Sequence, residues 1–194
     1  MPVELEAKFL EIDRDEMRQK LQAAGYHCSQ PNYLMRRVVF DLPGDVSNAW
    51  ARVRDEAGLT TISYKRTHSA DRVDGTEEIQ ITADSFENAA ALLAALGLIR
   101  KSYQETWREV WVKDRIELTL DEWPAVPPFC EIEAPDTPTL QAAAAELGLV
   151  WESALFGPVS IAYARYGIPE ALINAYPLLT FATVDELRAA AKVA

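Results

Sequence analysis

Cysteine and histidine are both scarce in this chain. Two cysteines, Cys28 and Cys130, and two histidines, His27 and His68, occur among its 194 residues. Two cysteines do not make the disulfide framework of a small secreted domain, and two histidines cannot build a typical zinc site. We interpret both cysteines as ordinary thiols in a reducing cytoplasm, which is the location expected for this protein.

The sequence also lacks long apolar runs and an excess of basic residues. No stretch approaches the length of a membrane span, and the N-terminal residues lack the basic and apolar regions of a signal peptide. Lysine and arginine total 19 against 30 aspartates and glutamates, which gives a formal net charge of −11. Nucleic acids and anionic membranes require a basic face, so neither is an expected partner. A local basic pocket is still compatible with this balance.

The length and the pattern of residues predict one domain of strands and helices. Alternating apolar residues and turn signals predict strands over residues 3–9, 33–41, 49–54, 60–67, 76–82, 103–113, 115–121 and 129–134. Apolar residues at helical spacing predict helices over residues 13–25, 85–96, 139–147, 158–166, 169–175 and 184–194. The proline-rich stretch 124–128 is predicted to be a loop.

Charged and apolar residues alternate on nearly every predicted strand. In VELEAKF, residues 3–9, the side chains of Glu4, Glu6 and Lys8 share one face, because successive side chains on a strand point to opposite faces. One such strand usually has its charges in water, but the recurrence argues for a different arrangement. The polar faces predicted in this way contain Arg37, Arg52, Arg54, Thr61, Ser63, Lys65, Glu78, Gln80, Arg108, Glu117, Thr119, Asp121, Glu131 and Glu133.

These faces carry charges of both signs, and the opposite faces are apolar enough to be buried under amphipathic helices. With the helices outside, the charged faces must point at each other. A sheet of about eight strands closed on itself does this and removes the unpaired edges. We therefore predict an α+β fold: a closed eight-stranded antiparallel β-barrel, a tunnel with a polar, charged interior and helices packed outside.

A charged interior is costly, because buried ion pairs often fail to recover their desolvation energy. Its residue types therefore indicate a function. A site of carboxylates without histidine or thiolate suits Mg²⁺ or Mn²⁺. Arginine and lysine suit a polyanion, because arginine can donate two parallel hydrogen bonds to phosphate oxygens. Metal-binding acids that face phosphate-binding bases predict a phosphoryl-transfer site.

The order of these residues resembles that of the CYTH superfamily, the triphosphate tunnel metalloenzymes. The resemblance implies an eight-stranded tunnel, open at both ends, that binds triphosphate compounds with divalent metal. It implies a tunnel domain over residues 1–168. Residues 169–194 lie beyond it, and we predict that they form a helical extension packed on the barrel, because termini seldom carry chemistry. The motifs that carry the resemblance, from residue 3 to about residue 166, are Glu4-x-Glu6-x-Lys8, Arg52-x-Arg54, Lys65, Glu78, Arg108, Asp121 and Glu131-x-Glu133.

The resemblance also implies roles for individual residues. Thr106 and Arg108 stand where a Lys-x-Arg pair is common, which moves one basic contact to Arg37 or Arg100. One metal would bind the triphosphate and a second would activate the attacking water. The implied phosphate-binding residues are Lys8, Arg37, Arg52, Arg54, Lys65 and Arg108. The implied metal ligands are Glu4, Glu6, Glu131 and Glu133, with Glu78, Glu117 and Asp121 as helpers, and the catalytic residues are Lys8, Glu6 and Glu133.

Three functions remain open. The preferred one is metal-dependent hydrolysis of a triphosphate compound (inorganic triphosphate first, then a nucleotide or thiamine triphosphate). The second is a class IV adenylyl cyclase, which makes cyclic AMP and pyrophosphate from ATP. The third is a non-catalytic module that binds polyphosphate or nucleotide. Hydrolysis is preferred because nothing marks a purine pocket or a group to deprotonate the ribose, and because the acidic half of the site is complete. The oligomeric state is not fixed by the sequence, and a homodimer is one option.

Overall fold

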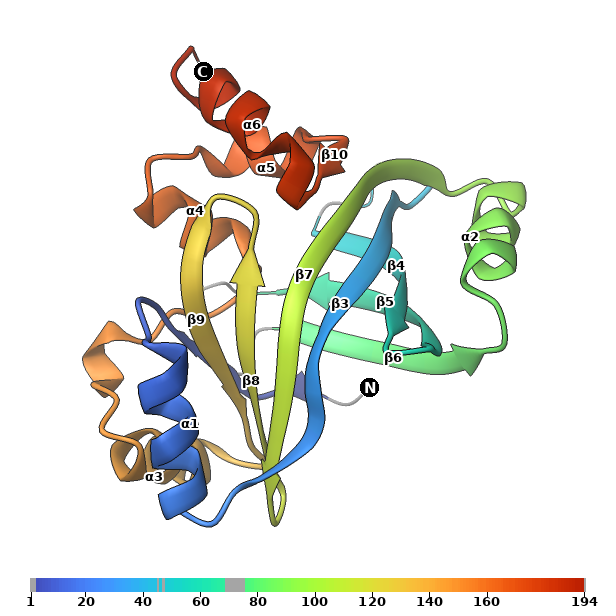
Figure 1. The fold of residues 1–194 in the computed structure, drawn as a ribbon. Coiled ribbons are helices and arrows are strands. Elements are labelled where there is room, and N and C mark those ends of the chain that lie inside the picture. The colour runs from blue at the N-terminus through green and yellow to red at the C-terminus, as the bar shows by residue number, and fades with distance from the viewer. Residues whose placement is uncertain (1–2, 45, 47, 69–75, 194) are drawn as a thin grey trace.

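The computed structural model describes residues 3–44, 46, 48–68 and 76–193, which form a strongly curled antiparallel sheet with helices around it (Figure 1). Within these residues, ten strands make one sheet in the order β1-β6-β5-β4-β3-β7-β8-β9-β2, with β10 beside β7. The strands are β1 (Val3–Glu4), β2 (Glu6–Phe9), β3 (His27–Asp41), β4 (Ala49–Glu56), β5 (Leu59–Thr67), β6 (Thr76–Ala83), β7 (Ile99–Lys113), β8 (Ile116–Trp123), β9 (Val126–Glu133) and β10 (Leu178–Leu179).

The N-terminal segment contacts both ends of this strand order. Strand β1 pairs antiparallel with β6, and β2 pairs antiparallel with β9, while only Leu5 separates β1 from β2. When β1 and β2 are counted as one extended segment, the path contains the eight strands that the sequence predicts. The α+β class and the curled, eight-stranded antiparallel sheet are confirmed.

Side-chain caps mark where the longer helices begin. The carboxylate of Asp13 accepts hydrogen bonds from the backbone N–H groups of Asp15 and Glu16, and Ser85 and Asp136 cap two further helices in the same manner. The helices are α1 (Arg14–Ala23), α2 (Phe86–Ala95), α3 (Thr137–Glu146), α4 (Ser160–Arg165), α5 (Glu170–Ala175) and α6 (Val184–Ala191), with short 3₁₀ turns η1 (Trp151–Ser153) and η2 (Phe181–Thr183). No helix in the described part of the chain is long and apolar enough to cross a membrane.

The helices bury most of the outer face of the sheet. Helices α1 and α3 contribute Leu21 and Leu140 to a cluster with Leu118 of β8 and Ile132 of β9. Helix α2 contributes Leu93 to a second cluster over β3 and β4. The prediction that helices cover every outer face is wrong at β6, where Ile79 is 48% and Ile81 59% exposed. The reason is the position of helix α2, which packs against the neighbouring strands β4 and β5.

The tail differs from the purely helical prediction. Strand β10 pairs parallel with β7, with Leu178 opposite Tyr103. Ile173, Leu179 and Leu187 of the tail are buried in one cluster with Tyr163 of α4. The tail therefore shares a core with the rest of the chain, and the boundary at residue 168 stays a prediction.

The predicted loop over residues 124–128 is also shorter than expected, because β9 begins at Val126. Val126 pairs with Trp123 across a tight turn, and the pairing of β9 with β2 starts only at Cys130. Pro127 and Pro128 thus lie in a part of β9 that β2 does not reach, where a strand tolerates residues without an N–H donor.

Candidate functional site

The concave face of the sheet encloses a cavity of about 1050 Å³. Arg100 is exposed and is not part of its wall, whereas Arg37 is. Glu4 lies on β1, but its side chain falls outside the described part of the structure. Every other residue predicted for the site lines this single cavity: Glu6, Lys8, Arg37, Arg52, Arg54, Lys65, Glu78, Arg108, Glu117, Asp121, Glu131 and Glu133.

Lys8 joins two of the predicted metal ligands. Its Nζ atom lies 2.7 Å from Oε1 of Glu6 and 3.0 Å from Oε2 of Glu131, and the residue is 4% exposed. Burial alone would lower the pKa of Lys8, but the Glu131 and Glu6 carboxylates raise it above its usual value. Glu131 has a lowered pKa, because Lys8 and Arg108 outweigh the effect of its burial. Lys8 and Glu131 are therefore both charged at neutral pH.

A second buried ion pair crosses from β7 to β8. Arg108 and Asp121 are paired in register, and the Nε–H of Arg108 donates to Oδ1 of Asp121 at 2.7 Å. A second guanidinium N–H donates to the other carboxylate oxygen, which makes the contact bidentate. Asp121 is 1% exposed, so this pair is fixed in the cavity wall.

Strands β4 and β5 contribute a group of three cations, and β6 contributes partners for them. Arg52 and Lys65 share the carboxylate of Glu78, at 3.3 and 3.4 Å. Arg54 donates to the side-chain oxygen of Gln80 at 2.7 Å and lies 3.4 Å from Glu56. Burial, followed by repulsion from Arg52, lowers the pKa of Arg54 to about 10.

Arg37 is a buried cation with no ion-pair partner in the ranges that the structure describes. Its side chain donates to the hydroxyl of Thr106 at 2.8 Å and to the sulfur of Met35, both neutral groups, and its buried Nε–H has no partner among the described residues. Burial and the nearby Arg52, Arg108 and Arg54 lower its pKa well below the usual value. A dianionic or more highly charged ligand would relieve this repulsion, since each guanidinium could donate to it.

Carboxylates gather on the opposite part of the wall. Glu6, Glu133 and Glu117 occupy in-register positions on β2, β9 and β8. The side chains of Glu133 and Glu117 are open to solvent, yet the surrounding protein reduces their hydration. This desolvation, followed by the neighbouring carboxylates of Glu117, Glu131 and Glu6, raises the pKa of Glu133 to about 7. Desolvation likewise raises the pKa of Glu117. Mutual repulsion of this kind is relieved by a cation among the carboxylates.

The donor set fits a hard divalent cation, because it consists of carboxylate oxygens only. As the side chains lie, no three acidic, histidine or cysteine side chains in the described ranges converge closely enough to hold a metal ion. Lys8 explains part of this, since it draws Glu6 and Glu131 to itself at 2.7 and 3.0 Å. Metal binding here thus requires these carboxylates to turn toward Glu133.

Some cavity residues were not predicted. Glu56 follows Arg52 and Arg54 at the same two-residue spacing in ARVRDE, so the alternation itself could have revealed it. Ser160 and Asn174 of helices α4 and α5 also line the cavity. Nothing in the local sequence of these helices signals that position, because it depends on how the tail packs.

The fold is shared with several solved structures. No model of a known protein family matches the sequence, and no curated protein matches it. The structure is similar to the PH1012 protein of Pyrococcus horikoshii OT3, with 21% identity, a TM-score of 0.67, and coverage of 78% of this chain and 93% of that one. A candidate adenylate cyclase of Vibrio parahaemolyticus gives 15% identity, a TM-score of 0.70, and coverage of 84% and 98%.

A third similar structure is that of HpAC1 from Hippeastrum, a candidate adenylyl cyclase reported to have a dominant triphosphatase activity. It is 16% identical, with a TM-score of 0.55 and coverage of 86% of this chain and 96% of that one. These similarities show a shared fold, with which the resemblance of the sequence to the CYTH superfamily agrees. The roles of individual residues stay predictions.

Proposed function

We propose that this protein binds a triphosphate compound in its cavity and hydrolyses the terminal phosphoanhydride with the help of Mg²⁺ or Mn²⁺, with inorganic triphosphate as the preferred substrate. The observation that carries the proposal is the group of arginines around Arg37, whose buried guanidinium has only neutral hydrogen-bond partners among the described residues. A polyphosphate supplies the missing negative charge. The triphosphatase activity reported for HpAC1, which has a similar fold, agrees with this choice.

The proposed site is a tunnel closed by the N-terminal segment. Closure is supported by the pairing of β1 with β6 and of β2 with β9, because these are the outermost strands of the order. A closed sheet surrounds the substrate with side chains from all strands and leaves the ends for entry and exit.

The residues then divide the work. Arg37, Arg52, Arg54, Lys65 and Arg108 donate hydrogen bonds to phosphate oxygens and fix the chain of phosphates for in-line attack. Lys8 holds the carboxylates of Glu6 and Glu131 in place. Glu133 is the proposed acceptor of a proton from the attacking water; its pKa of about 7 applies to the protein without a cation, and a cation bound among these carboxylates would lower it.

The divalent cation would be held by Glu4, Glu6, Glu131 and Glu133, with Glu78, Glu117 and Asp121 nearby. When bound, it would supply charge neutralisation at the phosphates and a lower pKa for water.

The adenylyl cyclase remains a second candidate on one observation. The cavity of about 1050 Å³ is larger than three phosphates need, so an adenosine group could also enter. The Vibrio parahaemolyticus protein and HpAC1 are both described as candidate cyclases. One fold hosts several activities, so the products must decide.

The experiment is product analysis with inorganic triphosphate, thiamine triphosphate and ATP in parallel, each with Mg²⁺, Mn²⁺ or a chelator. Chelator-sensitive release of phosphate, fastest from inorganic triphosphate, supports the proposal. Cyclic AMP with pyrophosphate from ATP supports the cyclase instead. Tight binding of triphosphate without any product would indicate a binding module. The absence of both binding and turnover would overturn the proposal.

A further inference from the structure

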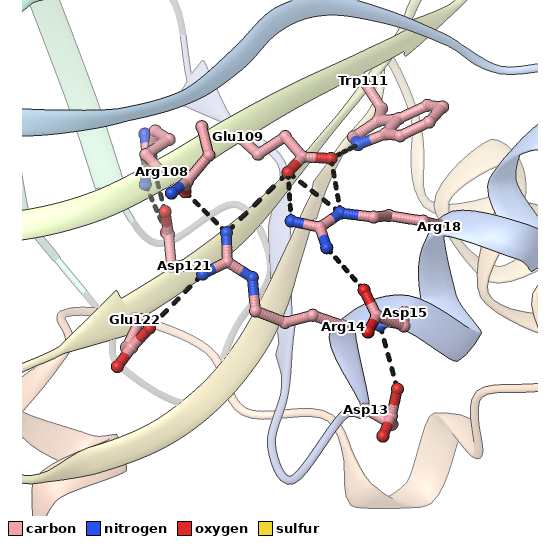
Figure 2. Close-up of polar contacts among 10 residues, drawn as sticks. Asp13, Arg14, Asp15, Arg18, Arg108, Glu109, Trp111, Asp121 and Glu122 are labelled. Atoms are coloured by element: carbon pink, nitrogen blue, oxygen red, sulfur yellow. Dashed lines mark hydrogen bonds and ion pairs between the residues drawn. The ribbon is translucent and has the colours of Figure 1, made fainter.

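Arg14 of helix α1 connects three strands from outside the cavity (Figure 2). Its Nη2 atom donates to the side-chain oxygen of Asn32 on β3 at 2.6 Å and lies 3.8 Å from Oε2 of Glu109 on β7. Its Nη1 atom donates to Oε2 of Glu122 on β8 at 3.3 Å. One guanidinium therefore contacts β3, β7 and β8, which are neighbours in the sheet.

Each of these three contacts lies next to a cavity residue in the sequence. Tyr33 follows Asn32, Arg108 precedes Glu109, and Asp121 precedes Glu122. Tyr33 is in register with Arg108, and Arg108 is in register with Asp121, so the three cavity residues form one row across the sheet. Because adjacent residues on a strand point to opposite faces, Arg14 contacts the outer face of the sheet directly behind this row.

The contacts of Arg14 are partly buried. The side chain is only 16% exposed and that of Glu109 only 6%. The buried Nε–H of Arg14 has no partner in the described part of the chain, a cost that the other contacts must offset. On β3 the register shifts between Gln30 and Tyr33, so the strand is irregular where Asn32 is held. A planar fork with several donors can tie such an irregular segment to two regular strands.

We infer that Arg14 is a positioning residue: it fixes the row Tyr33–Arg108–Asp121 and so aims the Arg108 guanidinium into the cavity. The effect of Arg14 on the Arg108–Asp121 contact is inferred without reference to the proposed function. The effect on triphosphate binding rests in addition on the proposed function.

Arg18 offers a matched control on the same helix. It binds Glu109 more closely than Arg14 does. Its Nη2 atom lies 2.7 Å from Oε2 of Glu109, and its Nε atom lies 3.1 Å from each of the two carboxylate oxygens. Its other charged partner is Asp15 on α1 itself. Replacing Arg18 thus removes positive charge from Glu109 without removing a contact to β3 or β8.

The test compares Arg14→Ala, Arg14→Lys and Arg18→Ala in the full chain. The Nε–H signal of Arg108, observed by ¹⁵N NMR and assigned through its loss in Arg108→Lys, reports the 2.7 Å bond to Asp121. Calorimetry with inorganic triphosphate in the presence of Mg²⁺ reports binding. We expect both Arg14 variants to shift or broaden the Arg108 signal and to weaken triphosphate binding about 5- to 30-fold, which is within the range seen for residues that act indirectly. Arg14→Lys should fail as well, because a lysine ammonium cannot bridge three strands.

Arg18→Ala should leave the Arg108 signal and the affinity close to those of the wild type. An unchanged signal in Arg14→Ala would overturn the inference, and so would an equal change in Arg18→Ala, because the role would then be to neutralise Glu109. If Arg14→Ala does not fold, Glu122→Ala removes only the contact to β8, from a side chain that is 40% exposed, and a smaller shift of the same signal is expected. A wild-type protein that binds no triphosphate refutes the proposed function, while the NMR comparison still decides the inference.

Discussion

The guanidinium carbon of Arg37 lies 4.3 Å from the centre of the Trp123 ring. Trp123 in turn packs edge-on against Tyr163, whose hydroxyl donates to the backbone oxygen of Pro124 at 2.7 Å. The buried cation is thus held by an aromatic face and by neutral hydrogen-bond acceptors. A cation–π contact of this kind orients a guanidinium without neutralising it, which suits a group that must bind an anion.

Arg37→Met should weaken the binding of inorganic triphosphate by about 10- to 100-fold, the range expected for a lost hydrogen bond to a charged group. The melting temperature should stay unchanged or rise, because the variant removes a buried cation that Arg52, Arg54 and Arg108 repel. Calorimetry and thermal unfolding measure the two effects.

Arg36→Met is the control for Arg37→Met. Arg36 is the preceding residue on β3 and forms an ion pair with Asp55 outside the cavity. Its loss should leave triphosphate binding unchanged. Equal loss of affinity in both variants would mean that Arg37 is not a ligand.

Lys8→Met should behave in the opposite way with respect to stability. It leaves Glu6 and Glu131 without their shared cation, and removing one partner of a buried ion pair costs about 3–5 kcal/mol. Chemical denaturation of Lys8→Met, Glu131→Gln and the double variant measures the coupling. We expect the double variant to be more stable than Lys8→Met, and strictly additive losses would contradict the pairing.

The residues that face the cavity could be predicted because strand alternation is local. Arg52, Arg54 and Lys65 were assigned to one face from two short stretches, and the structure places all three in the cavity wall. The ion partners could not be predicted in the same way. Lys8 contacts Glu131 across more than 120 residues of sequence, and that choice depends on the pairing of β2 with β9.

The predictions that failed concern packing between distant segments. A chain that alternates Ile79 and Ile81 with polar residues looks the same whether or not a helix covers it, and here both isoleucines are exposed. Strand β3 starts at His27 rather than at residue 33, because the register shifts around Pro31 let the strand continue past a proline. The parallel pairing of β10 likewise depends on where the tail meets β7.

Val53→Asp should prevent or severely weaken folding. Val53 is fully buried in the cluster under α2, and a carboxylate there would have no partner. Ile81→Asp is a matched control, since Val53, Ile62 and Ile81 lie in one register row, yet Ile81 is 59% exposed. Circular dichroism and thermal unfolding compare the two. Similar stability of both variants would contradict the assignment of outer and inner faces.

Glu133→Gln should stabilise the protein increasingly as the pH rises from about 4.5 to about 7. The pKa of Glu133 is raised from 4.5 to about 7 in the folded protein, so the folded state keeps a proton that the unfolded chain releases. The wild type therefore loses stability as the pH rises through this window, whereas glutamine has no proton to lose.

Thermal unfolding of Glu133→Gln and wild type, at several pH values between 4.5 and 8 with chelator present, measures this difference. The gap in melting temperature should grow with pH and level off above pH 7, because Glu133 is then ionised beside Glu117 and Glu131. Glu152→Gln, at an exposed position in η1, controls for the general loss of one negative charge, and its gap is subtracted from that of Glu133→Gln at each pH. A corrected gap that stays constant with pH would show that the carboxyl group of Glu133 titrates as an ordinary glutamate. The crowding of carboxylates that favours a cation at this end of the cavity would then be absent in solution.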